Sequence, residues 1–239
     1  IKFPDKKDGF CAYASVRYSM PEWIVNYLCE EYGEDETERI FEGFLKADRG
    51  VSVRCNVSKA EPQEVYDMLK KQGISVKKSE LFDYAFSIDD FDRLQDVEAL
   101  KKGYIQVQDF SSILAGHIPE IKGGENIIDI CAAPGGKTLH IADRLNDRKL
   151  NGGGKIISCD LTDAKTALIK ENVERNGFEN VSVVKNDALA FKKEWEDTAD
   201  IVIADLPCSG LGVIGKKCDI KYKTSIEDIN ALSEIQREI

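Results

Sequence analysis

Two short motifs in the second half of the sequence place small residues, cysteines and carboxylates in patterns suited to chemistry on a bound ligand. The run from Cys131 to Thr138 reads Cys-Ala-Ala-Pro-Gly-Gly-Lys-Thr. Glycines let the backbone approach a ligand, and a helix that begins after them presents free N–H groups. The second motif, Asp205 to Gly212, holds Cys208 between Pro207 and loop-forming polar residues. A cysteine in such a loop is placed to reach a substrate, whereas a core cysteine would have apolar neighbours.

Acidic residues follow the predicted strands of this region. Asp160 ends the strand predicted over residues 155–159, and Asp187 and Asp205 follow strands predicted over residues 181–184 and 201–204. Ligands of open α/β sheets bind beyond the carboxyl ends of the strands, where a carboxylate can accept hydrogen bonds from both ribose hydroxyls. Another carboxylate can accept from an adenine amino group. The pattern predicts an adenosine-containing ligand and requires no phosphate.

The same glycine-rich turn has an alternative interpretation. Gly136-Lys137-Thr138 resembles the end of a P-loop, and residues 201–205 resemble the strand that accompanies one. The P-loop pattern needs a first glycine five positions before Gly136, and Cys131 stands there. A P-loop-like NTPase is therefore an alternative that lacks one of its required glycines.

A group of lysines follows the second motif. Its members are Lys216, Lys217, Lys221 and Lys223. Cations next to Cys208 can hold an RNA backbone and favour a thiolate, although a solvated basic face would have the same composition. The net charge of −10 repels phosphate, so any RNA contact must depend on local patches of this kind.

The order of predicted elements indicates two domains. Residues 1–103 predict a small α+β domain, with helices over 21–33 and 37–45, a strand over 51–57, a helix capped by Ser58, and strands over 74–76 and 81–88. Residues 104–239 alternate strand and helix, with strands at 127–130, 155–159, 181–184 and 201–204 and helices at 138–145 and 163–175. This alternation of strands and helices predicts a Rossmann-like parallel sheet covered on both faces. Ser225 and Asp228 predict a capping box for a last helix.

Composition limits the class of protein. The 239 residues are 42% hydrophobic and 32% charged, which is typical of a globular protein. No apolar run approaches the roughly 20 residues of a membrane span, and no signal peptide is visible. The 7 cysteines are odd in number and form no Cys-x-x-Cys pair. We therefore expect reduced thiols, no metal site, no membrane association and a cytoplasmic location.

With these motifs the sequence resembles the RNA cytosine-5 methyltransferases of the Nol/Nop/Sun type, most of all the bacterial enzymes that act on small-subunit ribosomal RNA. The matching stretches are residues 17–19, 21–23, 53–56, 107–109, 129–138, 205–212 and 219–222. The resemblance implies a Rossmann-like methyltransferase core after a small RRM-like domain, with S-adenosylmethionine as cofactor and RNA as partner. Ribosomal RNA is favoured as the substrate, and transfer RNA is the alternative.

The resemblance also assigns roles to residues. Those matching cofactor contacts are Cys131, Ala132, Ala133, Pro134, Gly135, Gly136, Lys137, Asp160, Lys165, Asp187 and Asp205. Asp205 further matches the acid that hydrogen-bonds the cytosine ring, and Cys208 matches the cysteine that helps to release the product. The implied reaction adds a cysteine thiolate to C6 of cytosine, which makes C5 nucleophilic.

The nucleophilic cysteine of this family belongs to a Thr-Cys-Ser motif on a later strand. That motif does not occur in these 239 residues. We therefore expect a fragment whose sheet lacks its last strands, a monomer that binds S-adenosylmethionine weakly and transfers no methyl group. The alternative is a non-catalytic protein that binds S-adenosylmethionine or RNA without a nucleophile.

Overall fold

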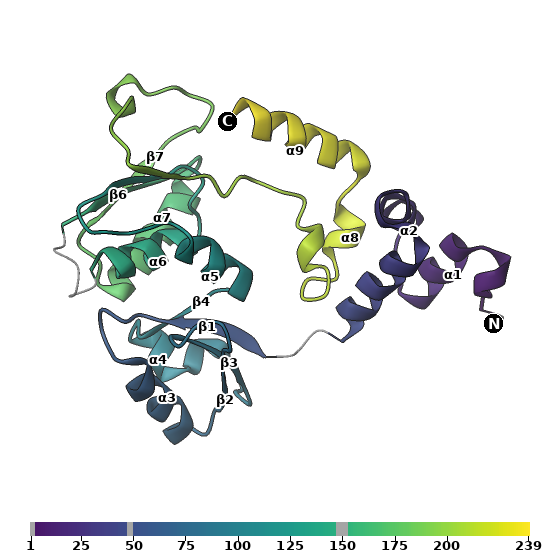
Figure 1. Cartoon of the computed structure of the whole chain (residues 1–239), viewed down its shortest axis with the longest axis horizontal. Helices are drawn as coiled ribbons and strands as arrows, with labels where there is room; N and C mark the ends of the chain where they lie inside the picture. The colour runs from purple at the N-terminus through teal and green to yellow at the C-terminus, as the bar shows by residue number, and fades with distance from the viewer. Residues whose placement is uncertain (1–2, 47–49, 147–152) are drawn as a thin grey trace. The chain divides into compact units, whose positions relative to one another are not determined.

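The structure, a computed structural model, describes residues 3–46, 50–146 and 153–239 (Figure 1). Its internal contacts divide the chain into two compact units. The helical unit comprises Ile1–Asp48 and Pro207–Ile239, and the two-sheet unit comprises Arg49–Leu206. The division between Leu206 and Pro207 falls inside the second motif, so Asp205 and Cys208 belong to different units.

The helical unit joins the two ends of the described chain. Its helices are α1 (Phe10–Arg17), α2 (Glu22–Leu45), α8 (Ile220–Lys223) and α9 (Ile226–Glu238). Buried Phe10, Ile24 and Phe41 pack with Ile214, which follows the second motif. Gly33 has a φ of 77° and divides α2 into two helical pieces, as the sequence predicted. The N-terminal helices therefore support the segment that carries Cys208.

The first sheet of the two-sheet unit is antiparallel, with strand order β2-β3-β1-β4. The strands are β1 (Val51–Cys55), β2 (Ser75–Lys78), β3 (Ala85–Asp89) and β4 (Ile105–Val107). Helices α3 (Pro62–Lys71) and α4 (Glu98–Lys101) supply Val65, Leu69 and Ala99 to a core with Val53 and Cys55. Strand β4 lies after Gly103, the boundary predicted between the domains, and completes this sheet.

One predicted helix start is wrong. Ser58 does not cap α3; Glu61 does, in a capping box with Glu64. Pro62 occupies the first turn, where a missing backbone N–H costs nothing. The Ser58 hydroxyl instead donates to the carboxylate of Asp143, 2.6 Å away. The Ser58 side chain thus bonds to a residue far away in the sequence and does not cap the helix that follows it.

The second sheet is parallel, with strand order β7-β6-β5-β8. It contains β5 (Asn126–Asp129), β6 (Lys155–Asp160), β7 (Val181–Lys185) and β8 (Ile201–Ile203), and helices α6 (Gly136–Leu145) and α7 (Asp163–Asn176) follow the first two. These helices bury Ile127 and Ile156 on one face. On the opposite face Ile128 is buried, but Val202 is 58% exposed. The prediction that both faces are covered is therefore wrong at β8.

Helix α5 (Phe110–His117) links the two sheets within this unit (Figure 1). Ile113 of α5 packs with Ala85 of β3 and with Phe82, which precedes that strand, and α5 also packs along α6. Arg54, on the face of β1 opposite the Val53 core, is fully buried and forms an ion pair with Asp143 of α6. The face of the first sheet that carries Arg54 is thus covered by α6 of the second sheet.

A second polar contact holds the two sheets of this unit together. The Asn56 side-chain amide donates to the backbone carbonyls of Gly103 and Asn176, each at 3.1 Å. The Gln106 side-chain oxygen accepts from Arg175 at 2.9 Å. The bonds to Asn176 and from Arg175 connect the end of β1 and strand β4 with α7, in agreement with the grouping of both sheets in one compact unit.

Candidate cofactor and active site

The glycine-rich turn lies at the carboxyl end of β5 and is held in place by hydrogen bonds from its own backbone and from the Asn172 side chain. The Ala132 N–H donates to the Cys159 carbonyl at 2.8 Å, and the Asn172 amide donates to the Pro134 carbonyl at 2.8 Å. Gly135 caps α6 with a φ of 105°, a conformation that suits glycine. At Gly136 a Cβ atom would meet nothing within 4 Å, so open space lies beside the turn where a ligand can approach.

Asp160, at the end of β6, is tied to this turn. One carboxylate oxygen accepts from the Ala133 N–H at 2.9 Å, and the other accepts from the Leu161 N–H at 2.8 Å. Lys165, in the first turn of α7, forms an ion pair with Asp160 at 2.9 Å. Burial raises the pKa of Asp160, but the bonds from Lys165, Ala133 and Leu161 outweigh burial and hold the pKa below its usual range. The carboxylate is thus ionised and positioned to accept hydrogen bonds.

Asp129 forms a second carboxylate site, buried beneath the turn. Its side chain accepts from the Thr138 hydroxyl at 2.6 Å, and Thr138 also hydrogen-bonds Ser158 at 2.9 Å. Burial raises the pKa of Asp129 to about 6, although the bond from Thr138 opposes this shift. This network fixes the start of α6 against β5 and β6.

Lys137 and Asp205 meet across the ends of β5 and β8. The Lys137 ammonium lies 2.5 Å from an Asp205 carboxylate oxygen, and the Asp205 side chain is 59% exposed. Both residues line a cavity of about 180 Å³. The predicted residues in its wall are Cys131, Ala132, Ala133, Pro134, Gly136, Lys137 and Asp205. The structure therefore brings most of the predicted turn and the catalytic candidate Asp205 together around one cavity.

Residues that the sequence reasoning did not assign also line this cavity. Gln108 and Asp109 come from the segment that joins β4 to α5, and Ser112 comes from the first turn of α5. Gln108 is buried and hydrogen-bonds Arg54 at 3.1 Å. The sequence signal for this segment was the stretch at residues 107–109, which is one of those that resemble the methyltransferase family.

Asp187 lies apart from the cavity. It is exposed after β7, and its side chain accepts from the Leu189 N–H at 3.0 Å. Its neighbour Asn186 is buried and donates its backbone N–H to the Asp160 carbonyl at 3.0 Å. The ends of β6 and β7 are thus adjacent, and this contact places buried Asn186 next to Asp160.

The cysteines differ in their surroundings. Burial, together with nearby Asp160 and Asp129, raises the pKa of the Cys131 thiol, so it stays protonated beside the turn. Burial raises the pKa of the Cys159 thiol to about 11. Cys208 is exposed in the helical unit. Among these three thiols, Cys208 is the most open to a substrate.

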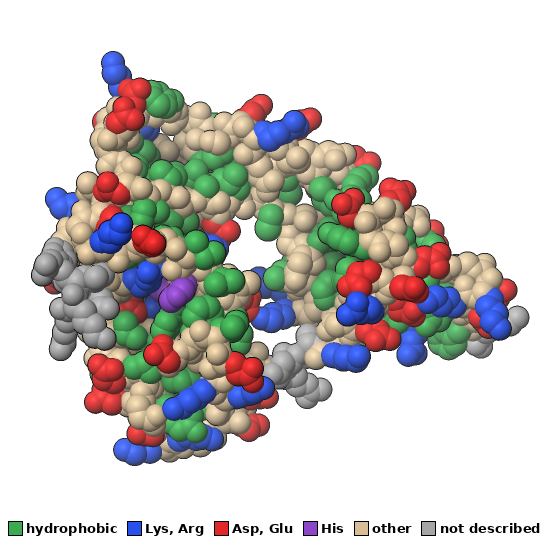
Figure 2. All heavy atoms as spheres, viewed as in Figure 1, with side chains coloured by type: hydrophobic (Ala, Val, Ile, Leu, Met, Phe, Trp, Pro, Cys, Tyr) green, Lys and Arg blue, Asp and Glu red, His purple; other side chains and the backbone are tan. Residues whose placement is uncertain are grey.

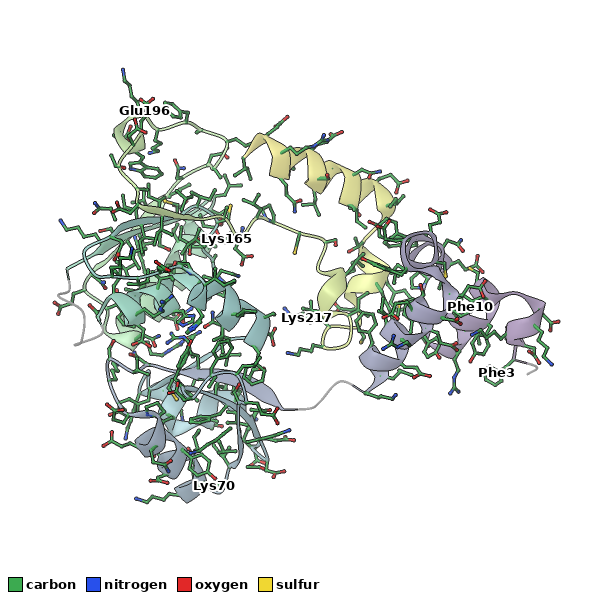
Figure 3. All side chains as sticks on the ribbon, viewed as in Figure 1. Phe3, Phe10, Lys70, Lys165, Glu196 and Lys217 are labelled. Atoms are coloured by element: carbon green, nitrogen blue, oxygen red, sulfur yellow. The ribbon has the colours of Figure 1, made fainter. Side chains whose placement is uncertain are left out.

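The four lysines predicted to bind RNA are not equivalent. Lys221 is only 8% exposed, and its ammonium lies 5.3 Å from the centre of the Tyr222 ring. Lys223 forms an ion pair with Asp219 at 2.6 Å. Lys216 and Lys217 are exposed, and Lys217 projects from the loop before α8 (Figure 3). Of the four lysines predicted to bind RNA, Lys221 is therefore much less accessible than Lys216 and Lys217.

Acidic and basic side chains are interspersed on the visible surface (Figure 2). Within residues 3–46, 50–146 and 153–239, no group of three or more His, Cys, Asp or Glu side chains is placed to hold a metal ion. In the same residues, no helix is both long and apolar enough to span a bilayer.

Comparison with known proteins matches both parts of the chain to one family. Residues 118–239 match the model of the 16S rRNA methyltransferase RsmB/F, and residues 20–94 match the ferredoxin-like domain of the same methyltransferases. The methyltransferases of this family depend on S-adenosylmethionine, which agrees with the predicted cofactor.

Individual relatives support the match. The probable ribosomal RNA small subunit methyltransferase B of Bacillus subtilis is 33% identical over 222 residues, covering 92% of this chain and 48% of that protein. The tRNA (cytosine(72)-C(5))-methyltransferase of Pyrococcus horikoshii is 34% identical over 144 residues, covering 60% of this chain and 35% of that protein. The chain spans about half the length of the methyltransferase B relatives that it matches.

A solved structure agrees in fold. The crystal structure of the protein PH0851 superposes with a TM-score of 0.88 and 31% identity, covering 99% of this chain and 52% of that chain. The predicted fold, a Rossmann-like methyltransferase sheet after a small α+β domain, is confirmed. The chain belongs to the 16S rRNA methyltransferase RsmB/F family, within the Nol/Nop/Sun group that its motifs resemble.

Proposed function

We propose that the protein to which this chain belongs transfers a methyl group from S-adenosylmethionine to C5 of a cytosine in RNA, with ribosomal RNA as the preferred substrate. One observation supports this most: the turn from Cys131 to Lys137 meets the carboxylates of Asp160 and Asp205 at one edge of a parallel sheet. That edge is where open α/β sheets bind their ligands.

The residues present fit the cofactor. Asp160 is ionised and tied to the turn, which suits hydrogen bonds from ribose hydroxyls, and Gly136 leaves open space beside it. Lys137 and Lys165 provide cations that can hold the carboxylate of the amino-acid moiety. When bound, S-adenosylmethionine supplies an electrophilic methyl group. Asp187 is assigned to the same site by resemblance, at the neighbouring strand end.

The proposed chemistry uses Asp205 and Cys208 in different steps. The Asp205 carboxylate, held by Lys137, hydrogen-bonds the ring of a cytosine that has left its stack. A cysteine thiolate adds to C6 and leaves a nucleophilic C5 that takes the methyl group. Loss of the C5 proton then lets the bond to C6 break and the thiolate depart. Cys208 serves this release, and Lys216, Lys217 and Lys223 bind the RNA backbone.

A second substrate has specific support. The relative from Pyrococcus horikoshii is described as acting on cytosine 72 of transfer RNA, and it matches 60% of this chain. Transfer RNA is therefore the second candidate. Methylation assays with ribosomal and transfer RNA transcripts distinguish the two, since only the true substrate gains 5-methylcytosine.

Calorimetry of this chain tests the cofactor site. Asp160→Ala removes an acceptor of charged hydrogen bonds, each worth about 1.5–3 kcal/mol, so affinity for S-adenosylmethionine should fall roughly 10- to 150-fold. Asp163→Ala is the matched control, because Asp163 pairs with Lys185 and its side chain is 84% exposed. Equal affinity in both variants would place the ribose elsewhere. ATP that binds more tightly than S-adenosylmethionine would favour an NTPase.

A further inference from the structure

One wall of the cofactor cavity comes from the small antiparallel sheet. Strand β4 ends at Val107, and Val107, Gln108 and Asp109 line the cavity of about 180 Å³ together with Cys131 and Lys137 of the glycine-rich turn. Strand β4 pairs with β1 in the first sheet, whereas the turn follows β5 of the second sheet. Both sheets of the two-sheet unit therefore contribute to the cavity.

Gln108 is fixed in this wall by bonds to β1 and to α5. Its backbone N–H donates to the Ser52 carbonyl at 3.1 Å, which continues the pairing of β1 with β4 beyond Val107. Its side-chain oxygen accepts from Nε of Arg54 at 3.1 Å, and its side-chain nitrogen donates to the Ser112 carbonyl at 3.3 Å. Gln108 is only 5% exposed, so these bonds determine how its amide is oriented.

Arg54, the partner of the Gln108 oxygen, is itself held on two sides. Its guanidinium forms the buried ion pair with Asp143 and also donates to the Cys55 carbonyl at 2.8 Å. Asp143 belongs to α6, the helix that begins directly after the cofactor turn. A chain of buried contacts thus runs from α6 through Arg54 to Gln108 in the cavity wall. Hydrogen bonds to a charged group in such a buried network are among the stronger ones in proteins.

Gln106 provides a comparison within the same strand. It is 7% exposed, and its side-chain oxygen accepts from Arg175 of α7 at 2.9 Å. Both glutamines are thus buried and bonded to an arginine, and both tie the first sheet to other parts of the two-sheet unit. They differ in that Gln108 lines the cofactor cavity and Gln106 does not. A role in cofactor binding can therefore be separated from a role in stability.

We propose that Gln108 is a positioning residue of the cofactor site. Its amide, held between Arg54 and Ser112, sets the place of Val107 and Asp109 in the wall against which S-adenosylmethionine binds. A wall that is fixed before binding spares the cofactor the entropic cost of ordering it. The inference rests on the proposed cofactor site, and it gives the small antiparallel sheet a part in cofactor binding.

Two matched substitutions test this role. Gln108→Met and Gln106→Met each remove a buried amide and keep an unbranched side chain of similar length. Both should lower the free energy of unfolding, because each leaves an arginine N–H without its acceptor. In calorimetry of this chain, Gln108→Met should bind S-adenosylmethionine roughly 10-fold more weakly, whereas Gln106→Met should bind within about 2-fold of the wild type. Equal affinities in the two variants would overturn the proposal.

A conservative variant tests the bond from Arg54 itself. Gln108→Glu keeps an oxygen that can accept from Arg54, so it should recover part of the affinity that Gln108→Met loses. If Gln108→Glu binds S-adenosylmethionine as weakly as Gln108→Met, the bond from Arg54 does not position the wall.

Hydrogen exchange of the unaltered chain provides a measurement that does not depend on the folding of any variant. Saturating S-adenosylmethionine should slow the exchange of backbone amides in residues 105–113 as well as in residues 131–138. Helix α3, which packs on the Val53 face of the first sheet, should exchange at an unchanged rate. Protection of residues 131–138 without residues 105–113 would show that the small sheet takes no part in binding the cofactor.

Failure of this inference and failure of the proposed cofactor site give different results. If Asp160→Ala weakens the binding of S-adenosylmethionine and Gln108→Met does not, the positioning role of Gln108 is wrong and the cofactor site stands. If neither substitution weakens binding, the cofactor site itself is misplaced.

Discussion

Arg54 of β1 and Asp143 of α6 form an ion pair that is almost completely withdrawn from water. The distance between the guanidinium and carboxylate is 2.5 Å, and the two side chains are 0% and 2% exposed. The same carboxylate accepts from the Val57 and Ser58 N–H groups at 3.1 and 2.8 Å. Because β1 belongs to the first sheet and α6 covers the second, this pair fixes the small sheet onto the methyltransferase core.

Removing one partner of this pair should destabilise the protein strongly. Asp143→Asn leaves the Arg54 charge buried without its counter-ion, and breaking a buried pair in this way costs about 3–5 kcal/mol. Denaturant unfolding measures the loss of stability. Asp96→Asn is the control, since Asp96 pairs with Lys101 where both side chains are more than half exposed, and should cost less than about 1 kcal/mol. Equal, small losses of stability would show that the buried pair does not hold the sheets together.

Asp129 should give the protein a distinctive dependence on pH. Its pKa is about 6 when folded and near 3.9 when unfolded, so the folded protein binds the extra proton between these values. The stability that this proton contributes is complete below pH 4 and is lost as pH rises through 6. Relative to Asp129→Asn, the wild type should therefore lose about 2 kcal/mol between pH 4 and 7.

The contribution of Asp160 to stability should depend on pH in the opposite direction to that of Asp129. Its folded pKa lies below the usual range, so its contribution is present above the unfolded pKa and is lost as pH falls. The difference in unfolding free energy between wild type and Asp160→Asn should therefore shrink on acidification, opposite to Asp129→Asn. If the stability difference from wild type changed with pH in the same direction for both variants, the opposite pKa shifts of Asp129 and Asp160 would be wrong.

RNA binding should separate the lysines after the second motif. If exposed Lys216 and Lys217 bind phosphates, replacing both with alanine should reduce the slope of log affinity against log salt by roughly 0.7–0.9 for each phosphate that is no longer bound. Lys221→Ala should leave the slope unchanged, because Lys221 is only 8% exposed. The whole protein is the material for this measurement. If the salt dependence changed only for Lys221→Ala, then Lys221 would be the phosphate contact in place of Lys216 and Lys217.

The strands and the cofactor edge could be predicted because their signals are local. The apolar runs that become β5 and β6 end at Asp129 and Asp160, so strand ends and site acids coincide in the sequence. Glycines at positions 33 and 135 marked a break and a turn that the backbone adopts with positive φ. Each of these features depends on neighbours within a few residues.

Long-range partners account for what the sequence did not predict. Ser58 had the type and position of a helix cap, but Asp143, 85 residues later, binds its hydroxyl. The grouping of the N-terminal helices with Ile214 likewise depends on core packing between distant segments. Lys221 carried the charge of a surface residue, yet it is buried in a segment whose Tyr222 hydroxyl donates to the distant Ser19 carbonyl. Composition and periodicity contain no information about these pairings.

Replacing Cys208 should show whether this cysteine adds to C6 of cytosine or helps to release the methylated product. If one cysteine adds to C6 and Cys208 assists departure from the methylated product, Cys208→Ala in the whole protein should still form the adduct. The RNA would then remain covalently attached, and a protein–RNA band should survive denaturing electrophoresis. Cys218→Ala is the matched control, because Cys218 is the other exposed cysteine and lies ten residues after Cys208. If Cys208 is the nucleophile instead, Cys208→Ala should trap no RNA and methylate none. Methylation by these 239 residues alone would also favour that second role, because Cys131 stays protonated beside the turn and Cys159 is buried.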